Sequence, residues 1–195
     1  MRTAEIERKT NETEVNVKLN VDGKGNASVN TGINFLNHML TTFAKYSMFD
    51  VKINAKGDLK VDEHHTVEDI AIVLGQALDK ALAERKGMFR YGSAIVPMDD
   101  ALVVVAVDIG GRSYLQFDND FKREMVGDMP TELFFDFFDS FSRSCKSNFA
   151  IKILSGRNEH HKIEATFKAL GIAMRKACEF DQMRKGEIPS TKGVI

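Results

Sequence analysis

The chain has 195 residues, enough for one domain or for two small halves that share a core. Apolar residues make up 43%, charged residues 28%, and the formal net charge is −1, so nothing favours a nucleic-acid partner. No apolar run approaches the roughly 18 residues that cross a bilayer, and the first residues lack an apolar signal core. Two cysteines without CxxC spacing favour reduced thiols, and we expect a cytoplasmic protein without a membrane partner.

The first half of the chain alternates between strand and helix patterns. Residues 14–21 alternate polar and apolar side chains, as does the segment 49–55, and both are predicted strands. The stretch 33–46 is rich in apolar residues at helical spacing. A second helix is predicted to begin near His64 and to continue through 74–81, which contains no proline.

The second half repeats this order. The apolar run 102–107 and the segment 112–117 are predicted strands, and 149–154 is a further one. A phenylalanine-rich helix is predicted over 131–146, and the tail of a last helix over 170–177.

One pentad occurs in both halves. His64-His65-Thr66-Val67-Glu68 returns as His160-His161-Lys162-Ile163-Glu164, an offset of 96 residues, and 74–81 aligns with 170–177 at the same offset. We therefore predict a tandem duplication with half-repeats 1–91 and 92–195 in one compact unit. Because sheets and helices must cover each other's apolar faces, we expect an α+β fold with two four-stranded sheets packed around a helical layer.

The repeated pentad predicts metal binding. Residues three and four apart share a face of a helix, so Glu68 is expected beside His64 and His65, and Glu164 beside His160 and His161. A single histidine is more simply a surface or core residue. Two copies of the same pattern, which contain four of the five histidines, favour two metal sites, one in each half.

A third ligand is predicted for each half. His38 precedes His64 by 26 residues and Asp136 precedes His160 by 24, which makes them counterparts. A carboxylate within a run of phenylalanines needs a partner, although a solvent-facing or capping role is the simpler alternative for Asp136, as a surface position is for His38. Imidazole and carboxylate without thiolate favour manganese or iron over a closed structural zinc site. The expected ligands are His38, His64, His65, Glu68, Asp136, His160, His161 and Glu164.

In their order along the chain, these motifs resemble the imidazoleglycerol-phosphate dehydratase family. The resemblance covers nearly the whole length and is specific because many short motifs occur in series. Its segments are 8–13, 38–40, 57–59, 64–69, 74–78, 97–102, 111–115, 158–169 and 188–194.

The resemblance implies a ribosomal-protein-S5-domain-2-like fold in duplicate, two Mn²⁺ ions per chain, and a homo-oligomeric shell of 24 subunits with shared sites. It implies dehydration of imidazole glycerol phosphate to imidazole acetol phosphate in histidine biosynthesis. Glu68 and Glu164 would be ligands, and Glu12 a substrate contact that handles protons. The substrate phosphate would be bound by Arg90, Arg112, Lys168, Ser190, Thr191 and Lys192.

The sequence departs from the family at several positions. Asp136 stands where the family usually has histidine, and Asn37, Thr42 and Ala150 also differ. Two hypotheses follow: an active dehydratase with an altered metal site, or a metal-assembled homologue without the reaction. The ligand chemistry alone also allows a dinuclear hydrolase.

Overall fold

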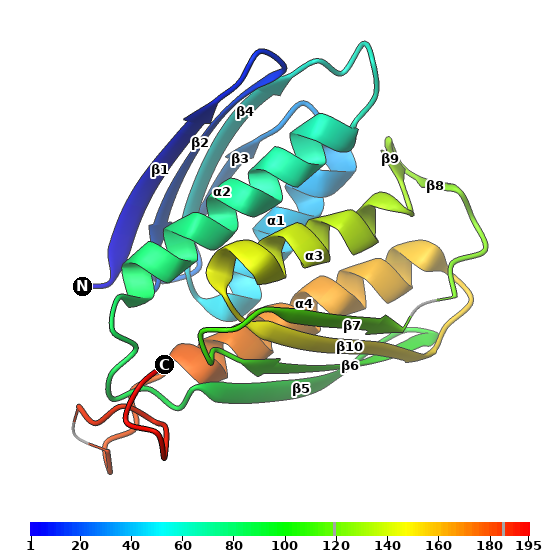
Figure 1. The fold of residues 1–195 in the computed structure, drawn as a ribbon. Coiled ribbons are helices and arrows are strands. Elements are labelled where there is room, and N and C mark those ends of the chain that lie inside the picture. The colour runs from blue at the N-terminus through cyan, green and yellow to red at the C-terminus, as the bar shows by residue number, and fades with distance from the viewer. Residues whose placement is uncertain (119, 185) are drawn as a thin grey trace.

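The computed structural model describes residues 1–118, 120–184 and 186–195. Two sheets enclose a layer of helices, and each half contributes one sheet and two helices (Figure 1). The predicted α+β architecture with a duplicated half-domain is therefore confirmed. No helix in the described ranges combines the length and apolar character that a bilayer crossing needs.

The first half forms the sheet β1-β2-β4-β3. Its pairs are antiparallel except β3–β4, which is parallel. The elements are β1 (Thr3–Lys9), β2 (Thr13–Asn20), β3 (Ala27–Asn30), α1 (Asn34–Ser47), β4 (Asp50–Gly57) and α2 (His64–Leu82).

The second half forms the sheet β5-β6-β10-β7, in which β7 and β10 are the parallel pair. A short hairpin, β8–β9, precedes its first helix. The elements are β5 (Tyr91–Met98), β6 (Ala101–Asp108), β7 (Tyr114–Asp118), β8 (Met125–Val126), β9 (Met129–Pro130), α3 (Leu133–Cys145), β10 (Asn148–Ser155) and α4 (Glu159–Cys178).

The core lies between each sheet and its helices. Alternation along β2 turns Val15, Val17 and Leu19 inward, where each is at most 3% exposed. The phenylalanines of α3 also face the core. At helical spacing along one face, the buried residues are Phe134, Phe137, Phe138 and Phe141. This burial explains why a phenylalanine-rich segment forms a helix here.

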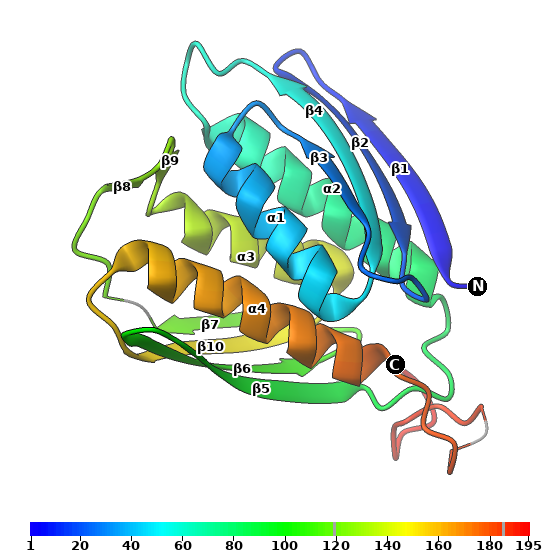
Figure 2. The same cartoon turned by 180° about the vertical axis from the view of Figure 1, so that it is seen from behind.

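Helices from different halves pack against each other in the middle layer: α1 against α4, and α2 against α3 (Figures 1 and 2). Two glycines at equivalent repeat positions allow the close approach. A Cβ atom on Gly171 of α4 would lie 2.9 Å from the backbone oxygen of Phe43 in α1, and one on Gly75 of α2 would lie 2.9 Å from that of Phe141 in α3. The fold thus brings the first helix of each half to the second helix of the other.

Candidate metal centre

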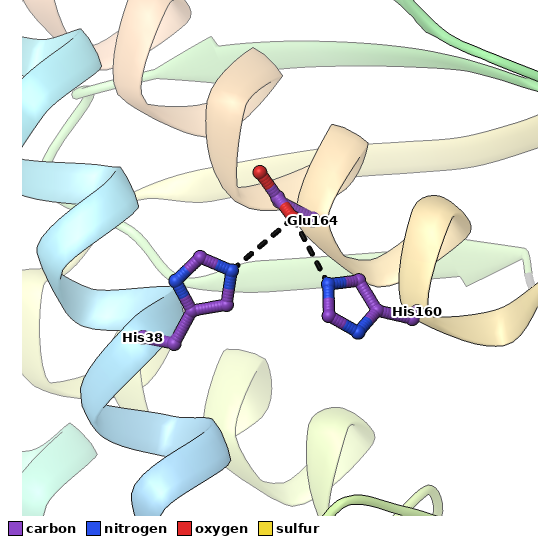
Figure 3. A group of neighbouring side chains, drawn as sticks. All are labelled: His38, His160 and Glu164. Carbon is purple, nitrogen blue, oxygen red and sulfur yellow. Dashed lines mark hydrogen bonds and ion pairs between the residues drawn. The ribbon is translucent and has the colours of Figure 1, made fainter.

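Three side chains meet where α1 crosses the start of α4. Glu164 Oε2 lies 3.2 Å from His38 Nε2 and 3.1 Å from His160 Nε2. Figure 3 shows the carboxylate directed between the two rings. One donor atom from each residue lies within 4.8 Å of the other two. Two imidazole nitrogens and one carboxylate oxygen at this spacing can surround a transition-metal ion.

The helix caps fix the positions of these ligands. Asn158 caps α4, because its side chain accepts a 2.9 Å hydrogen bond from the His160 backbone nitrogen. The start of α1 is held from the other half: Asp128, in the β8–β9 turn, accepts hydrogen bonds from the backbone nitrogens of Asn34 (2.7 Å) and Phe35 (2.8 Å). Both helices therefore begin at defined places, which sets where the side chains one turn further on meet.

The Glu164 carboxylate is held ionised. It is only 12% exposed, and its second oxygen, Oε1, lies 3.0 Å from Lys168 Nζ. Burial alone would raise the pKa of Glu164, but hydrogen bonds from Lys168 and His38 outweigh it and hold the pKa below its ordinary value. One oxygen is thus bound by an ammonium group, and the other faces both imidazoles.

A second, more open group lies where α2 meets α3. His64 Nδ1 is 3.8 Å from Asp136 Oδ2, with 45% and 39% of the two side chains exposed. Glu68 follows His64 by one turn on the same helix and is half-buried. In the described part of the chain, Glu68 has no hydrogen bond or ion pair.

The ligands predicted for each half do not gather within that half. His38 belongs to the first half, whereas the pentad that it meets, at His160 and Glu164, belongs to the second. The α2–α3 group is crossed in the same way, with His64 from the first half facing Asp136 from the second. The reason is the helix layer, in which α1 packs on α4 and α2 on α3.

The second histidine of each pair turns away from the pentad's glutamate. Successive residues are rotated by about 100° around a helix. His161 therefore bonds Asp100, with Nδ1 2.6 Å from Oδ1, while His65 Nδ1 lies 3.0 Å from Asp58 Oδ2. The expectation that each glutamate lies beside both histidines of its pentad is wrong, since among the described residues Glu164 contacts only the first.

Sequence reasoning gave no role to Asp58 and Asp100, although both lie in segments that carry the resemblance. Asp100 also accepts hydrogen bonds from the backbone nitrogens of Arg157 and Asn158. The bond from His161, followed by these amides, lowers the pKa of Asp100. Asp58 in turn raises the pKa of His65. Each carboxylate holds Nδ1 of its histidine, so Nε2 is the ring nitrogen that can bind a ligand, and in His161 it lies 3.4 Å from Oδ2 of the exposed Asp99. The only sequence signal was an acid at the end of a strand.

Glu12 lies in the turn between β1 and β2, close to His65. Its Oε2 is 3.9 Å from His65 Nδ1, and 55% of its side chain is exposed. One donor atom each of Glu12, Asp58 and His65 lie within 4.8 Å of one another. The carboxylate therefore lies beside a predicted ligand and is accessible to a small molecule.

Most of the predicted phosphate contacts line a single hollow of about 680 Å³. Its wall includes Arg90, Arg112, Ser190, Thr191 and Lys192. Arg90, however, is already engaged: Nε and Nη2 bind Asp108 at 2.6 and 3.1 Å, and Nη1 donates to the Pro189 oxygen at 3.0 Å. Arg90 thus holds the C-terminal segment in place. Lys168 lies elsewhere, against Glu164.

The hollow and the metal group lie at opposite ends of α4. Arg90, in the hollow, donates its backbone nitrogen to Ala177 near the end of the helix, whereas His160 is at its start. With 20 residues, α4 is about 30 Å long. A small molecule cannot contact both within one chain.

Comparisons with known proteins agree with these motifs. Residues 31–174 match the family model of imidazoleglycerol-phosphate dehydratase. The chain is 52% identical over 194 residues to the imidazoleglycerol-phosphate dehydratase of Roseiflexus sp. (strain RS-1), which covers 100% of this chain and 98% of that one. It is 52% identical over 195 residues to that of Methanocella arvoryzae, with both chains covered completely.

Solved structures support the same assignment. The crystal structure of IGPD from Pyrococcus furiosus superposes with a TM-score of 0.84 at 38% identity, covering 97% of this chain and 100% of that one. The match therefore extends to both sheets and all the helices between them. The chain belongs to the imidazoleglycerol-phosphate dehydratase family.

Proposed function

We propose that the chain is a lyase of histidine biosynthesis that removes water from imidazole glycerol phosphate to give imidazole acetol phosphate. Family membership over the full length supports the activity. The observation that carries the assignment to this chain is the group of His38, His160 and Glu164, which offers the ligand types that the dehydration requires. The comparisons contain nothing that favours a non-catalytic homologue.

The donor set fits a bound metal. The family is metal-dependent. An ionised carboxylate beside two imidazole nitrogens is a donor set that suits octahedral ions of the first transition row, whereas structural zinc sites are rich in thiolate. We assign two Mn²⁺ ions per chain, with Fe or Zn less suitable. The ions supply Lewis acidity and a template for the substrate imidazole when bound. The proposed ligands are His38, His64, His65, Glu68, Asp136, His160, His161 and Glu164.

The remaining site residues are given roles in binding and proton transfer. Glu12 is exposed next to His65 and is our candidate for moving a proton at the substrate side chain. Arg112 and Lys192 line the hollow with positive charge, and Ser190 and Thr191 line it with hydroxyl groups, so we assign the phosphate there. Lys168 is our candidate for a phosphate contact reached from the metal side, and Arg90 supports the hollow.

We further propose that each catalytic site is shared between chains. The family is oligomeric, and the length of α4 separates the metal group from the hollow within one chain. We propose that Nε2 of His65 and of His161 binds an ion held by a neighbouring chain, and that His161 Nε2 then exchanges its contact with the exposed Asp99 for the ion. In a 24-subunit shell, which we propose for this chain, the metal group of one subunit can lie beside the hollow of the next. We also propose a cytoplasmic location, because Cys145 and Cys178 are buried free thiols.

Mixed oligomers test the sharing. Glu164→Gln removes a ligand, and Arg112→Ala removes charge from the hollow. If one site takes its metal group and its hollow from different chains, co-expression of the two inactive variants restores about a quarter of wild-type activity by random mixing. Mixtures that stay inactive while assembling normally would contradict sharing.

The activity itself is tested with purified protein reconstituted with Mn²⁺ and given imidazole glycerol phosphate. Formation of imidazole acetol phosphate is expected. Its absence in correctly assembled, metal-loaded protein would instead support the non-catalytic alternative.

A further inference from the structure

The two predicted metal groups differ in donor type, although they occupy equivalent positions of the repeat. The α1–α4 group has two imidazoles, from His38 and His160, and one carboxylate, from Glu164. The α2–α3 group has one imidazole, from His64, and a carboxylate from Asp136, with Glu68 one turn along the helix. The single exchange of His38 for its counterpart Asp136 turns a nitrogen-rich set into an oxygen-rich one.

The two groups also differ in how closely they are assembled. In the α1–α4 group both Nε2 atoms lie within 3.2 Å of one oxygen of Glu164, which is only 12% exposed. In the α2–α3 group the nearest approach is 3.8 Å, and Asp136 is 39% exposed. The nitrogen-rich group is therefore compact and more shielded, and the oxygen-rich one is open.

The second histidines do not remove this difference. His65 and His161 are equivalent in the repeat, and each has Nδ1 bound by an aspartate, while His161 Nε2 also lies 3.4 Å from Oδ2 of the exposed Asp99. Because they are equivalent in the repeat, we assign one of them to each site, which adds one imidazole to each. One site then keeps more nitrogen donors and the other more oxygen donors. Imidazole suits zinc, whereas carboxylate suits manganese and magnesium.

We propose that the two metal sites of this chain have different metal preferences. The α1–α4 site gives up Mn²⁺ to Zn²⁺ more readily, and the α2–α3 site, through Asp136, retains Mn²⁺ more firmly. This inference rests on the proposed function, in which both groups hold metal ions. It makes Asp136 a residue that determines metal preference.

Metal exchange in the assembled protein tests the proposal without an activity assay. The protein is loaded with MnCl₂, freed of excess metal and titrated with ZnCl₂, while electron paramagnetic resonance measures released Mn²⁺. Two separate release steps of one ion per chain are expected, with midpoints that differ by about tenfold or more. A single step that releases both ions together would overturn the proposal.

Reciprocal variants assign the steps. Asp136→His should move the later step to the zinc concentration of the earlier one, so that the two steps merge. His38→Asp should move the earlier step to higher zinc concentration. Circular dichroism melting and gel filtration establish that each variant folds and assembles. Two steps that persist unchanged in Asp136→His would overturn the role of Asp136.

The titration separates this proposal from the function on which it rests. Protein that retains no manganese after excess metal is removed would contradict the metal assignment itself. Protein that retains two ions per chain and releases them in one step leaves that assignment intact and contradicts only the difference in preference. Wild-type protein alone distinguishes these results, whether or not a variant folds.

Discussion

His38 and Glu164 are separated by 126 positions in the sequence, yet Nε2 of one lies 3.2 Å from Oε2 of the other. They come from different halves of the duplication. A metal bound at this contact would join the two halves. Metal binding and the packing of α1 on α4 are therefore expected to depend on each other.

Glu164→Gln should abolish most of the activity. The amide keeps the shape but removes the charge that faces His38 and His160, and Lys168 loses its carboxylate partner. We expect the turnover rate to fall by at least about a hundredfold, since Lewis-acid stabilisation contributes several kcal/mol. Manganese content should fall toward one ion per chain. Glu179→Gln, a change at a partly exposed residue just beyond the same helix, is the matched control. Full manganese content in Glu164→Gln would refute its role as a ligand.

Asp100→Asn should weaken metal binding without removing a predicted ligand. The carboxylate accepts from His161 Nδ1 and from two backbone amides, and an asparagine has only one oxygen to replace both carboxylate oxygens. Loss of such outer partners typically lowers metal affinity by about 10–100-fold. Isothermal titration with Mn²⁺ measures this, with the exposed Asp118→Asn as the control. Equal affinities in wild type and Asp100→Asn would show that the contact does not orient His161.

Gly171→Ala tests whether α1 and α4, which come from different halves, pack closely. In an ordinary helix, this substitution stabilises by about 1 kcal/mol. Here the new methyl group would meet the Phe43 backbone oxygen at 2.9 Å and force α1 away from α4. We expect a lower melting temperature and weaker manganese binding at the α1–α4 group. A higher melting temperature with unchanged metal affinity would contradict this close packing.

Asp128→Ala should destabilise the fold by about 1 kcal/mol, because the start of α1 loses its cap. Burial alone raises the pKa of Asp128, but hydrogen bonds from Phe35 and Asn34 outweigh it and lower the pKa. The contribution is therefore present above the ordinary aspartate pKa of 3.8 and is lost as the pH falls below it through the folded-state pKa. Urea unfolding at pH 7 and near pH 3 measures this. If the free energy of unfolding differs between variant and wild type by as much near pH 3 as at pH 7, the cap does not depend on an ionised Asp128.

The sequence predicted the elements and the duplication well, because both depend on local patterns. Alternation placed β2 and β4 to within about two residues, and the repeated pentad located the starts of α2 and α4. The pairing of helices across the halves could not be predicted in this way. It depends on Gly75 and Gly171, whose significance is visible only where another helix approaches.

The sequence proposes residues for the site but not how they are arranged. The repeat identified His38 and Asp136 as counterparts, but a one-dimensional pattern does not show which pentad each of them faces. Asp58 and Asp100 were missed because each lies outside the helix that carries its partner histidine, 7 and 61 residues further on, so helical spacing does not connect them. Arg90 was predicted to contact phosphate from the resemblance, and its ion pair with Asp108 could not be foreseen because it depends on how β5 and β6 pair.

Metal-dependent turnover tests the central claim most directly. Purified protein is stripped with a chelator, divided, and assayed with imidazole glycerol phosphate before and after Mn²⁺ is restored to two ions per chain. We predict no imidazole acetol phosphate from stripped protein and recovery of turnover with the metal. Equal rates with and without metal, or no product from the fully loaded assembly, would contradict the account.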